Sequence, residues 1–96
     1  MQARISNQRY NTKTSTVVCC EQVGLLKERG YQKDVLYMSK RGKYFLYRMT
    51  YANEAMVETI IPFSTNDAQG FMQECADNEQ ERIKQYYQVN KEIGHP

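Results

Sequence analysis

The sequence lacks the features that mark several large classes of protein. Its 96 residues contain no tryptophan, one histidine, two prolines and five glycines, which excludes collagen-like and proline-rich low-complexity chains. No apolar run approaches the roughly 18–20 residues that a helix needs to cross a bilayer. The first ten residues, MQARISNQRY, have no apolar core of the kind found in a secretory signal. We therefore expect one domain over residues 1–96, without a membrane span and located in the cytoplasm of a bacterial host.

The chain also has little of the chemistry that enzymes use. Its three cysteines include the adjacent pair Cys19 and Cys20, and an odd number with this spacing is not a disulfide framework. Two adjacent thiols cannot easily face one tetrahedral zinc ion, and there is no second Cys/His cluster. The single histidine, His95, stands next to the last residue, where chain ends are usually frayed. We predict no catalytic residue, no metal and no cofactor, and therefore no enzyme.

The charge of the chain is distributed unevenly. Residues 1–51 carry ten Lys and Arg against three Asp and Glu, whereas residues 52–96 carry three against eight. Two interpretations stay open. The two halves can pack with complementary charge, or the basic half can stay exposed and meet an anionic partner.

The middle of the chain gives the clearest structural pattern. Two runs rich in aromatic and other β-favouring residues, 35–39 and 43–51, flank a three-residue loop that ends in Gly42. Such a loop is a common hairpin connection when glycine takes its left-handed position. The resulting register pairs Tyr37 with Phe45. Both faces of this hairpin are apolar, so we expect a helix on one face and either the N-terminal segment or an associating partner on the other.

A third strand and a long helix are predicted to follow. Residues 56–61 are rich in β-branched side chains, and Pro62, which has no backbone N–H, should end this strand. Ser64 suits a helix N-cap, and Asp67 stands where a capping box places its acidic partner. Apolar residues then recur near helical spacing, which predicts a helix over about residues 65–90.

The N-terminal third allows two interpretations. Residues 14–18 read as a strand by propensity, because four of the five are β-branched. Residues 12–21 read as a short helix if Asn11 or Thr12 serves as its cap. The residues alone leave this choice open.

The candidate partner-binding residues lie on and beside the hairpin loop. Basic side chains there can contact phosphates or carboxylates, and neighbouring tyrosines offer stacking surfaces. A more ordinary explanation is that polar, lysine-rich hairpin tips keep a sheet edge soluble. The candidate residues are Lys40, Arg41, Lys43, Tyr44 and Arg48.

Three segments together resemble a group of small proteins from bacterial mobile elements and phages. The first is Tyr10-Asn11-Thr12, which in that group begins a short helix. The second is the hairpin sequence LYMSKRGKYFLY at residues 36–47, and the third is IIPFSTNDA at residues 60–68, which opens the last helix. The resemblance covers about residues 10–76, and it is what favours a helix over residues 12–21.

The resemblance implies a small α+β domain. Its expected elements are a short N-terminal helix, a three-stranded antiparallel sheet (about residues 35–39, 43–51 and 56–61) and a long C-terminal helix (about residues 65–90).

The setting of the group in mobile elements implies antagonism of host defence, as in anti-CRISPR proteins. We therefore expect a non-enzymatic protein that docks on a protein or ribonucleoprotein target, such as a Cas effector. A small nucleic-acid-binding module that uses the basic hairpin stays open as an alternative. A self-associating accessory protein, such as a homodimer that pairs through Tyr44 or Leu46, stays open as another.

Overall fold

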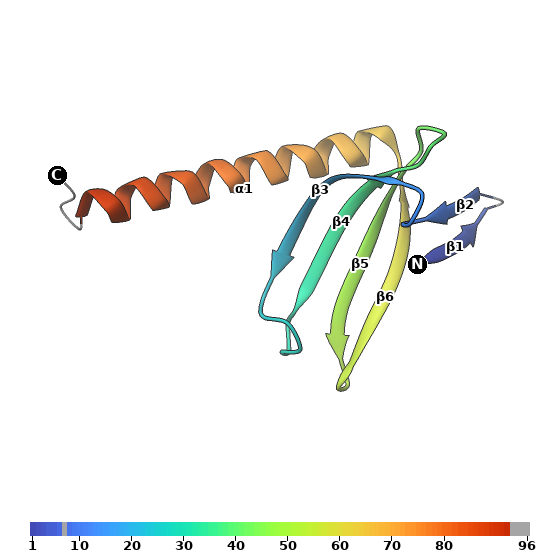
Figure 1. Ribbon diagram of the computed structural model, residues 1–96, viewed down its shortest axis with the longest axis horizontal. Helices are drawn as coiled ribbons and strands as arrows, with labels where there is room; N and C mark the ends of the chain where they lie inside the picture. Colours follow the sequence, from blue (N-terminus) through green and yellow to red (C-terminus); the bar gives the residue numbers. More distant parts are fainter. Residues whose placement is uncertain (7, 93–96) are drawn as a thin grey trace.

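The computed structural model describes residues 1–6 and 8–92, and the side chains of residues 1–6 and 8–84. Within these ranges the chain forms six strands and one helix: β1 (Gln2–Ile5), β2 (Gln8–Asn11), β3 (Thr16–Val23), β4 (Gln32–Met38), β5 (Tyr44–Ala52), β6 (Ala55–Phe63) and α1 (Thr65–Glu92). Strands β3–β4–β5–β6 form an antiparallel sheet in that order, and β1 and β2 form a separate hairpin. Helix α1 runs across one end of the large sheet and extends past β3 (Figure 1). His95 lies outside the described residues.

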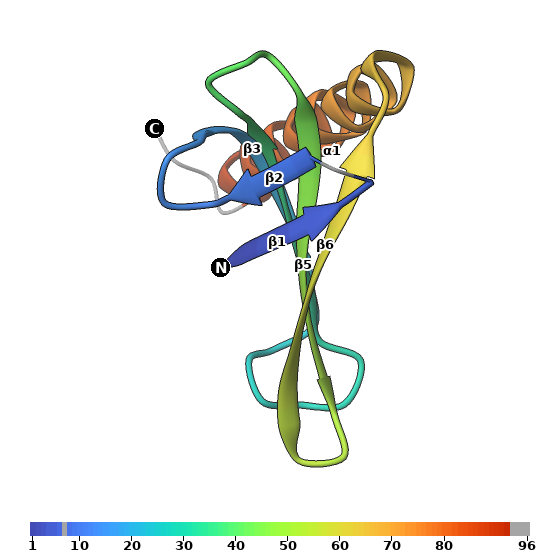
Figure 2. The same cartoon turned by 90° about the vertical axis from the view of Figure 1, so that its right-hand side faces the viewer.

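The two faces of the large sheet are covered by different elements near the same end. Helix α1 lies on one side of the sheet and the β1–β2 hairpin on the other (Figure 2). Because successive strand residues point to opposite faces, Phe45 packs toward the hairpin and its neighbour Leu46 packs toward the helix. Both side chains are almost fully buried. The N-terminal segment therefore covers the second apolar face, which is one of the two arrangements that the sequence left open.

The predicted short N-terminal helix and three-stranded sheet are wrong. Residues 16–23 form strand β3, which adds a fourth strand to the sheet by pairing with β4. Thr16, Val17 and Val18 are β-branched, and such side chains fit a pleated strand better than a helix. Local propensity therefore decides this segment, against the helix that the resemblance implied.

The hairpin prediction holds in its register. Tyr37 is opposite Phe45, and Val35 is opposite Tyr47. Gly42 has φ of +80°, the left-handed conformation that the loop requires. The third strand was predicted to stop before Pro62, but β6 continues through Phe63. Proline is tolerated there because β6 is an edge strand with a partner on only one side.

The start of α1 is fixed by the predicted capping box. The Asp67 backbone N–H donates to Ser64 Oγ at 3.0 Å, and the Ser64 N–H donates to Asp67 Oδ2 at 3.3 Å. Ala68 in the first turn is fully buried, and Phe71 and Met72 pack on the same cluster. No helix in the described part of the chain has the length and apolarity of a bilayer span.

Candidate functional site

The β1–β2 hairpin is anchored on the sheet through one aromatic side chain. Tyr10 is 6% exposed and packs with Ile60 and with Phe45, whose ring centroid lies 5.2 Å from that of Tyr10. Since strand residues alternate, the neighbours of the buried residues point away from the sheet. Arg4 and Arg9 occupy these outward positions and lie directly opposite each other across the hairpin. The buried tyrosine therefore fixes where two arginines stand.

The turn between β4 and β5 brings a second group of cations to the same end of the sheet. The Gly42 N–H donates to the Ser39 carbonyl oxygen at 2.9 Å, and the Ser39 N–H donates to the Lys43 carbonyl oxygen at 2.8 Å. The Lys43 N–H also donates to Ser39 Oγ at 3.1 Å. These bonds hold the turn in one conformation, with Lys40, Arg41 and Lys43 exposed.

The loop that joins β2 to β3 supplies a third side of the site. The Lys13 N–H donates to Asn11 Oδ1 at 3.0 Å, and Ser15 Oγ donates to the Asn11 carbonyl oxygen at 2.8 Å. An Asn side chain that binds the backbone two residues later stabilises a tight turn. The loop is thereby ordered beside the basic turn.

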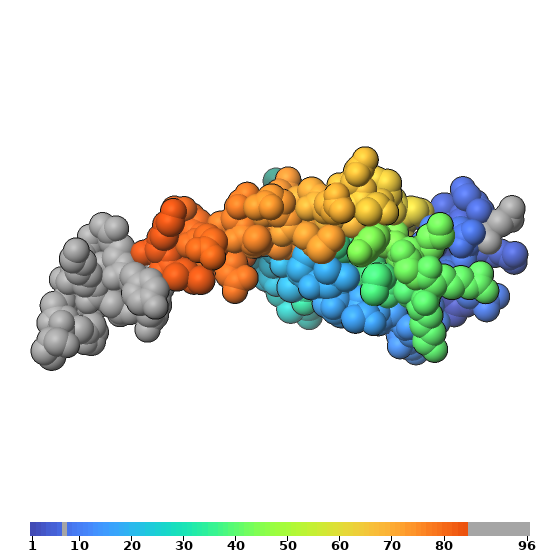
Figure 3. Space-filling view, turned by 90° about the horizontal axis from the view of Figure 1, so that it is seen from above, coloured from blue at the N-terminus to red at the C-terminus, as the bar shows by residue number. Residues whose placement is uncertain are grey.

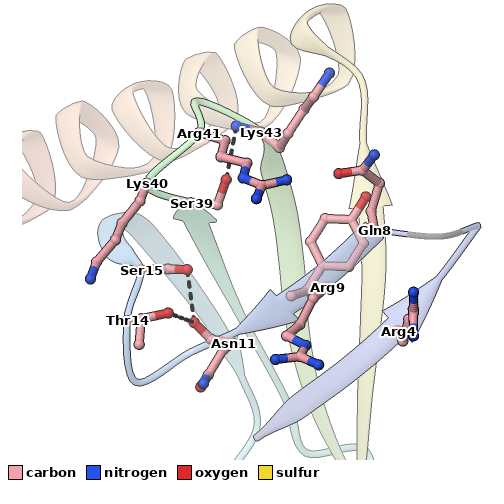
Figure 4. Close-up of a pocket in the computed structure, with 11 residues that line it drawn as sticks. Arg4, Gln8, Arg9, Asn11, Thr14, Ser15, Ser39, Lys40, Arg41 and Lys43 are labelled. Carbon is pink, nitrogen blue, oxygen red and sulfur yellow. Dashed lines mark hydrogen bonds between the residues drawn. The ribbon is translucent and has the colours of Figure 1, made fainter.

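These three segments surround an open pocket of about 470 Å³, which we call the basic pocket. Five cations and no carboxylate are among its lining residues. In Figure 4, the guanidinium of Arg41 points from the turn toward the hairpin that carries Arg9, whereas the Lys43 side chain extends away from the pocket. Figure 3 shows the turn (green) beside the N-terminal hairpin (blue) at one end of the molecule. The lining residues are Arg4, Gln8, Arg9, Tyr10, Asn11, Thr14, Ser15, Ser39, Lys40, Arg41 and Lys43.

The cations of the basic pocket have no acidic partner among the described residues. The ion pairs in that part of the chain are Arg48 with Asp34 and Arg82 with Glu21. Neither pair joins a cation of residues 1–51 to a carboxylate of the more acidic half. The described contacts between residues 1–51 and residues 52–96 therefore do not neutralise the positive charge of the basic pocket.

The structure separates the five residues that the sequence singled out. Lys40, Arg41 and Lys43 line the basic pocket. Tyr44 instead packs in the cluster beneath α1. Arg48 binds Asp34 through two hydrogen bonds, Nε to Oδ1 at 2.8 Å and Nη2 to Oδ2 at 3.2 Å. These bonds raise the pKa of the Arg48 guanidinium, so this arginine is held in place by its own carboxylate.

Sequence reasoning missed Arg4 and Arg9 as members of the site. A signal for the hairpin existed, because Ala3 and Ile5 alternate with polar residues in a pattern of period two. That this hairpin and the turn at residues 39–43 line one pocket depends on how the chain folds back, which no local pattern contains.

Two further reactive side chains, Cys19 and Cys75, lie on the helix side of the sheet. All three cysteines are free, and the Cys75 thiol lies 3.9 Å from the carbonyl oxygen of Cys20. Burial raises the pKa of the Cys19 and Cys75 thiols, which keeps them protonated and poorly nucleophilic at neutral pH. Among the described residues, no group of three or more His, Cys, Asp or Glu is placed to hold a metal ion. That the protein uses neither metal nor cofactor stays a prediction.

Comparison of the chain with protein-family models, with curated proteins and with solved structures gave no match. The resemblance to the group of mobile-element and phage proteins therefore stays a hypothesis based on its three sequence segments. The case for a function depends on the basic pocket.

Proposed function

We propose that this chain is a small non-enzymatic binding protein that docks through its basic pocket on an anionic surface of a protein or ribonucleoprotein target. The observation that carries the proposal is the meeting of five cations, two from the β1–β2 hairpin and three from the turn between β4 and β5, around one pocket that has no carboxylate in its lining. In line with the sequence resemblance, we propose that the target belongs to a host defence system, as for anti-CRISPR proteins.

The composition of the pocket supports binding in preference to catalysis. A general base at neutral pH is most often a histidine or a carboxylate, and a nucleophile needs such a base within hydrogen-bond reach. The lining contains cations, hydroxyls and amides but no His, Cys, Asp or Glu. These groups attract and orient an anion, and exposed charge of one sign also speeds association with a partner of opposite charge.

The geometry gives less support to self-association through Tyr44 and Leu46 of β5. Leu46 is 1% exposed and Tyr44 packs in the same cluster beneath α1. A second copy could reach these side chains only if the helix moved away. We therefore place the binding surface at the basic pocket.

The proposal is tested by affinity capture from host cells, with and without nuclease treatment of the lysate. The pocket variant Arg9→Ala/Arg41→Ala removes two exposed pocket charges. The matched control Arg29→Ala/Lys84→Ala removes two exposed charges elsewhere.

We expect the unmodified chain and the control to retain one defined defence protein or ribonucleoprotein, and the pocket variant to lose it. The captured target, once purified, should form a stoichiometric complex with the chain and lose its activity. Equal retention of that target by the pocket variant would contradict the proposal.

A further inference from the structure

The polar groups of the basic pocket suit one kind of anion best. Besides its cations, the pocket presents the hydroxyl of Ser39 and the amides of Gln8 and Asn11 as donors, whereas the hydroxyls of Thr14 and Ser15 donate to the Asn11 carbonyl oxygen. Hydroxyl, amide and guanidinium donors are the groups that proteins use to bind phosphate oxygens of nucleic acids. Arginine in particular binds phosphate through two parallel hydrogen bonds.

The pocket offers no exposed aromatic side chain. Its one aromatic lining residue is Tyr10, which is 6% exposed and packed against Phe45. Aromatic side chains and arginines are the usual energetic centres of protein–protein interfaces, and the pocket offers only the arginines. Exposed aromatic side chains are also the stacking surfaces on which proteins bind the bases of single strands. An unpaired base therefore finds no stacking surface here.

The position of Arg4 directly opposite Arg9 also favours a phosphate ligand. Directly opposite residues in an antiparallel pair have Cα atoms about 4.5–5.5 Å apart, and like charges at such positions destabilise the pair. A phosphate between the two guanidiniums replaces this repulsion with two attractive contacts. The duplex backbone supplies such groups densely, at one negative charge per roughly 1.7 Å of helix axis.

We infer that the basic pocket binds the phosphodiester backbone of a double-stranded nucleic acid without reading its base sequence. The inference rests on the proposed function and deepens it, since it identifies the anionic surface of the target as its nucleic-acid duplex. Phosphate contacts set position and orientation but carry no sequence information. Duplex DNA and duplex RNA share this chemistry.

The test is fluorescence anisotropy with labelled duplexes of about 20 base pairs, in DNA and RNA arms, at salt concentrations from about 50 to 200 mM. Two unrelated sequences are used in each arm, and single strands of the same length and poly-L-glutamate serve as comparison ligands. We expect duplexes of unrelated sequence to bind equally, and more tightly than single strands or poly-L-glutamate.

The salt dependence gives the number of phosphates that the pocket neutralises. For four or five contacts, the slope of log affinity against log salt should be about −3.6 to −4.5 for duplex DNA. Arg9→Ala/Arg41→Ala should make the slope shallower by about two, because each lost phosphate contact changes it by about one. The control Arg29→Ala/Lys84→Ala should leave it unchanged. Circular dichroism and the urea midpoint check that each variant is folded.

Three results would overturn the inference: no duplex binding at the lowest salt, tighter binding of single strands or poly-L-glutamate than of duplexes, or an unchanged slope in the folded pocket variant. Each leaves the proposed function standing if the pocket variant still loses its captured target. The proposed function fails by itself if the pocket variant binds duplexes weakly but retains that target.

Discussion

Charged side chains are paired on the face of the sheet that α1 covers, but not at the end that carries the β1–β2 hairpin and the basic turn, which we call the hairpin end. On the helix side, Arg48 binds Asp34, and Arg82 of α1 binds Glu21 of β3 at 3.1 Å. At the hairpin end, Arg4 stands opposite Arg9, and the basic turn adds three more cations without a carboxylate among the pocket residues. Arginine thus stabilises the fold on one side and has no carboxylate partner among the described residues on the other.

Under our proposal, the end of the sheet that carries the basic pocket binds a partner at some expense of stability. Asp34 is 8% exposed, and a carboxylate so enclosed needs its guanidinium partner. The pocket cations are exposed, so solvent screens their repulsion, and the fold tolerates the lack of an acidic partner. Substitution of a paired residue should therefore change stability, whereas substitution of an unpaired pocket cation should change binding.

The largest effects should come from the two buried side chains that face opposite sides of β5. We expect Phe45→Ala to lower the free energy of unfolding by about 3–5 kcal/mol and Leu46→Ala by about 2–5 kcal/mol, because both leave cavities. Urea denaturation measures both losses. Under conditions where both variants stay folded, only Phe45→Ala should also weaken duplex binding, since Phe45 supports Tyr10. Equal loss of binding in both variants would remove the distinction between the two faces.

The Asp34–Arg48 pair should matter for stability and not for binding. Asp34→Asn leaves the half-buried Arg48 without its charged acceptor and should lower the free energy of unfolding by about 1–3 kcal/mol. Glu28→Gln, at an exposed carboxylate, is the control and should change stability by less than about 0.5 kcal/mol. Duplex affinity should stay the same in both variants. A loss of affinity in Asp34→Asn would assign Arg48 to the binding surface.

The stability of the hairpin-facing side should also fall at alkaline pH through one tyrosine. Burial, with the hydrogen bond that Tyr47 donates to Glu58, raises the pKa of Tyr47 to about 12. In the unfolded chain this phenol ionises near pH 10. The folded state therefore binds the proton more tightly, and the interaction is fully present below pH 10 and lost as pH rises to 12.

Comparison with Tyr47→Phe isolates this contribution from those of the other tyrosines. Between pH 10 and 12, the free energy of unfolding of the unmodified chain should fall relative to that of the variant by about 1–2 kcal/mol, below the full two-unit value because the ring is partly exposed. Urea midpoints at both ends of this range measure the difference. Parallel pH profiles for the two proteins would mean that Tyr47 keeps its ordinary pKa.

Local patterns predicted the parts of the fold that local interactions determine. The register around Gly42 and the cap of α1 at Ser64 and Asp67 follow from turn and capping chemistry within a few residues. The helix predicted over residues 12–21 is wrong because it follows from the resemblance, whereas the β-branched residues 16–18 favour a strand.

The candidate site was only partly accessible from the sequence. Lys40, Arg41 and Lys43 lie together along the chain, so their charge was visible. Whether a basic residue is free or paired depends on contacts between distant segments. Asp34 reaches Arg48 across neighbouring strands, and Tyr10 places Arg9 by packing on Phe45. Such contacts form only in the folded sheet, which is why two expected site residues, Tyr44 and Arg48, proved to be structural and two arginines were missed.

The smallest expected effect tests most directly whether the hairpin end holds its positive charge for a phosphate ligand. Urea unfolding of Arg9→Gln without duplex DNA measures the repulsion between Arg9 and Arg4, and unfolding with saturating duplex DNA measures the attraction of Arg9 to phosphate. Arg9→Lys, which keeps the charge, is the control. Without duplex, Arg9→Gln should be more stable than the unmodified chain by about 0.2–1 kcal/mol, because its repulsion with Arg4 is gone. With duplex, the unmodified chain and Arg9→Lys should gain more stability than Arg9→Gln. An Arg9→Gln chain that is less stable alone, or that gains as much from duplex as the unmodified chain, would contradict the account.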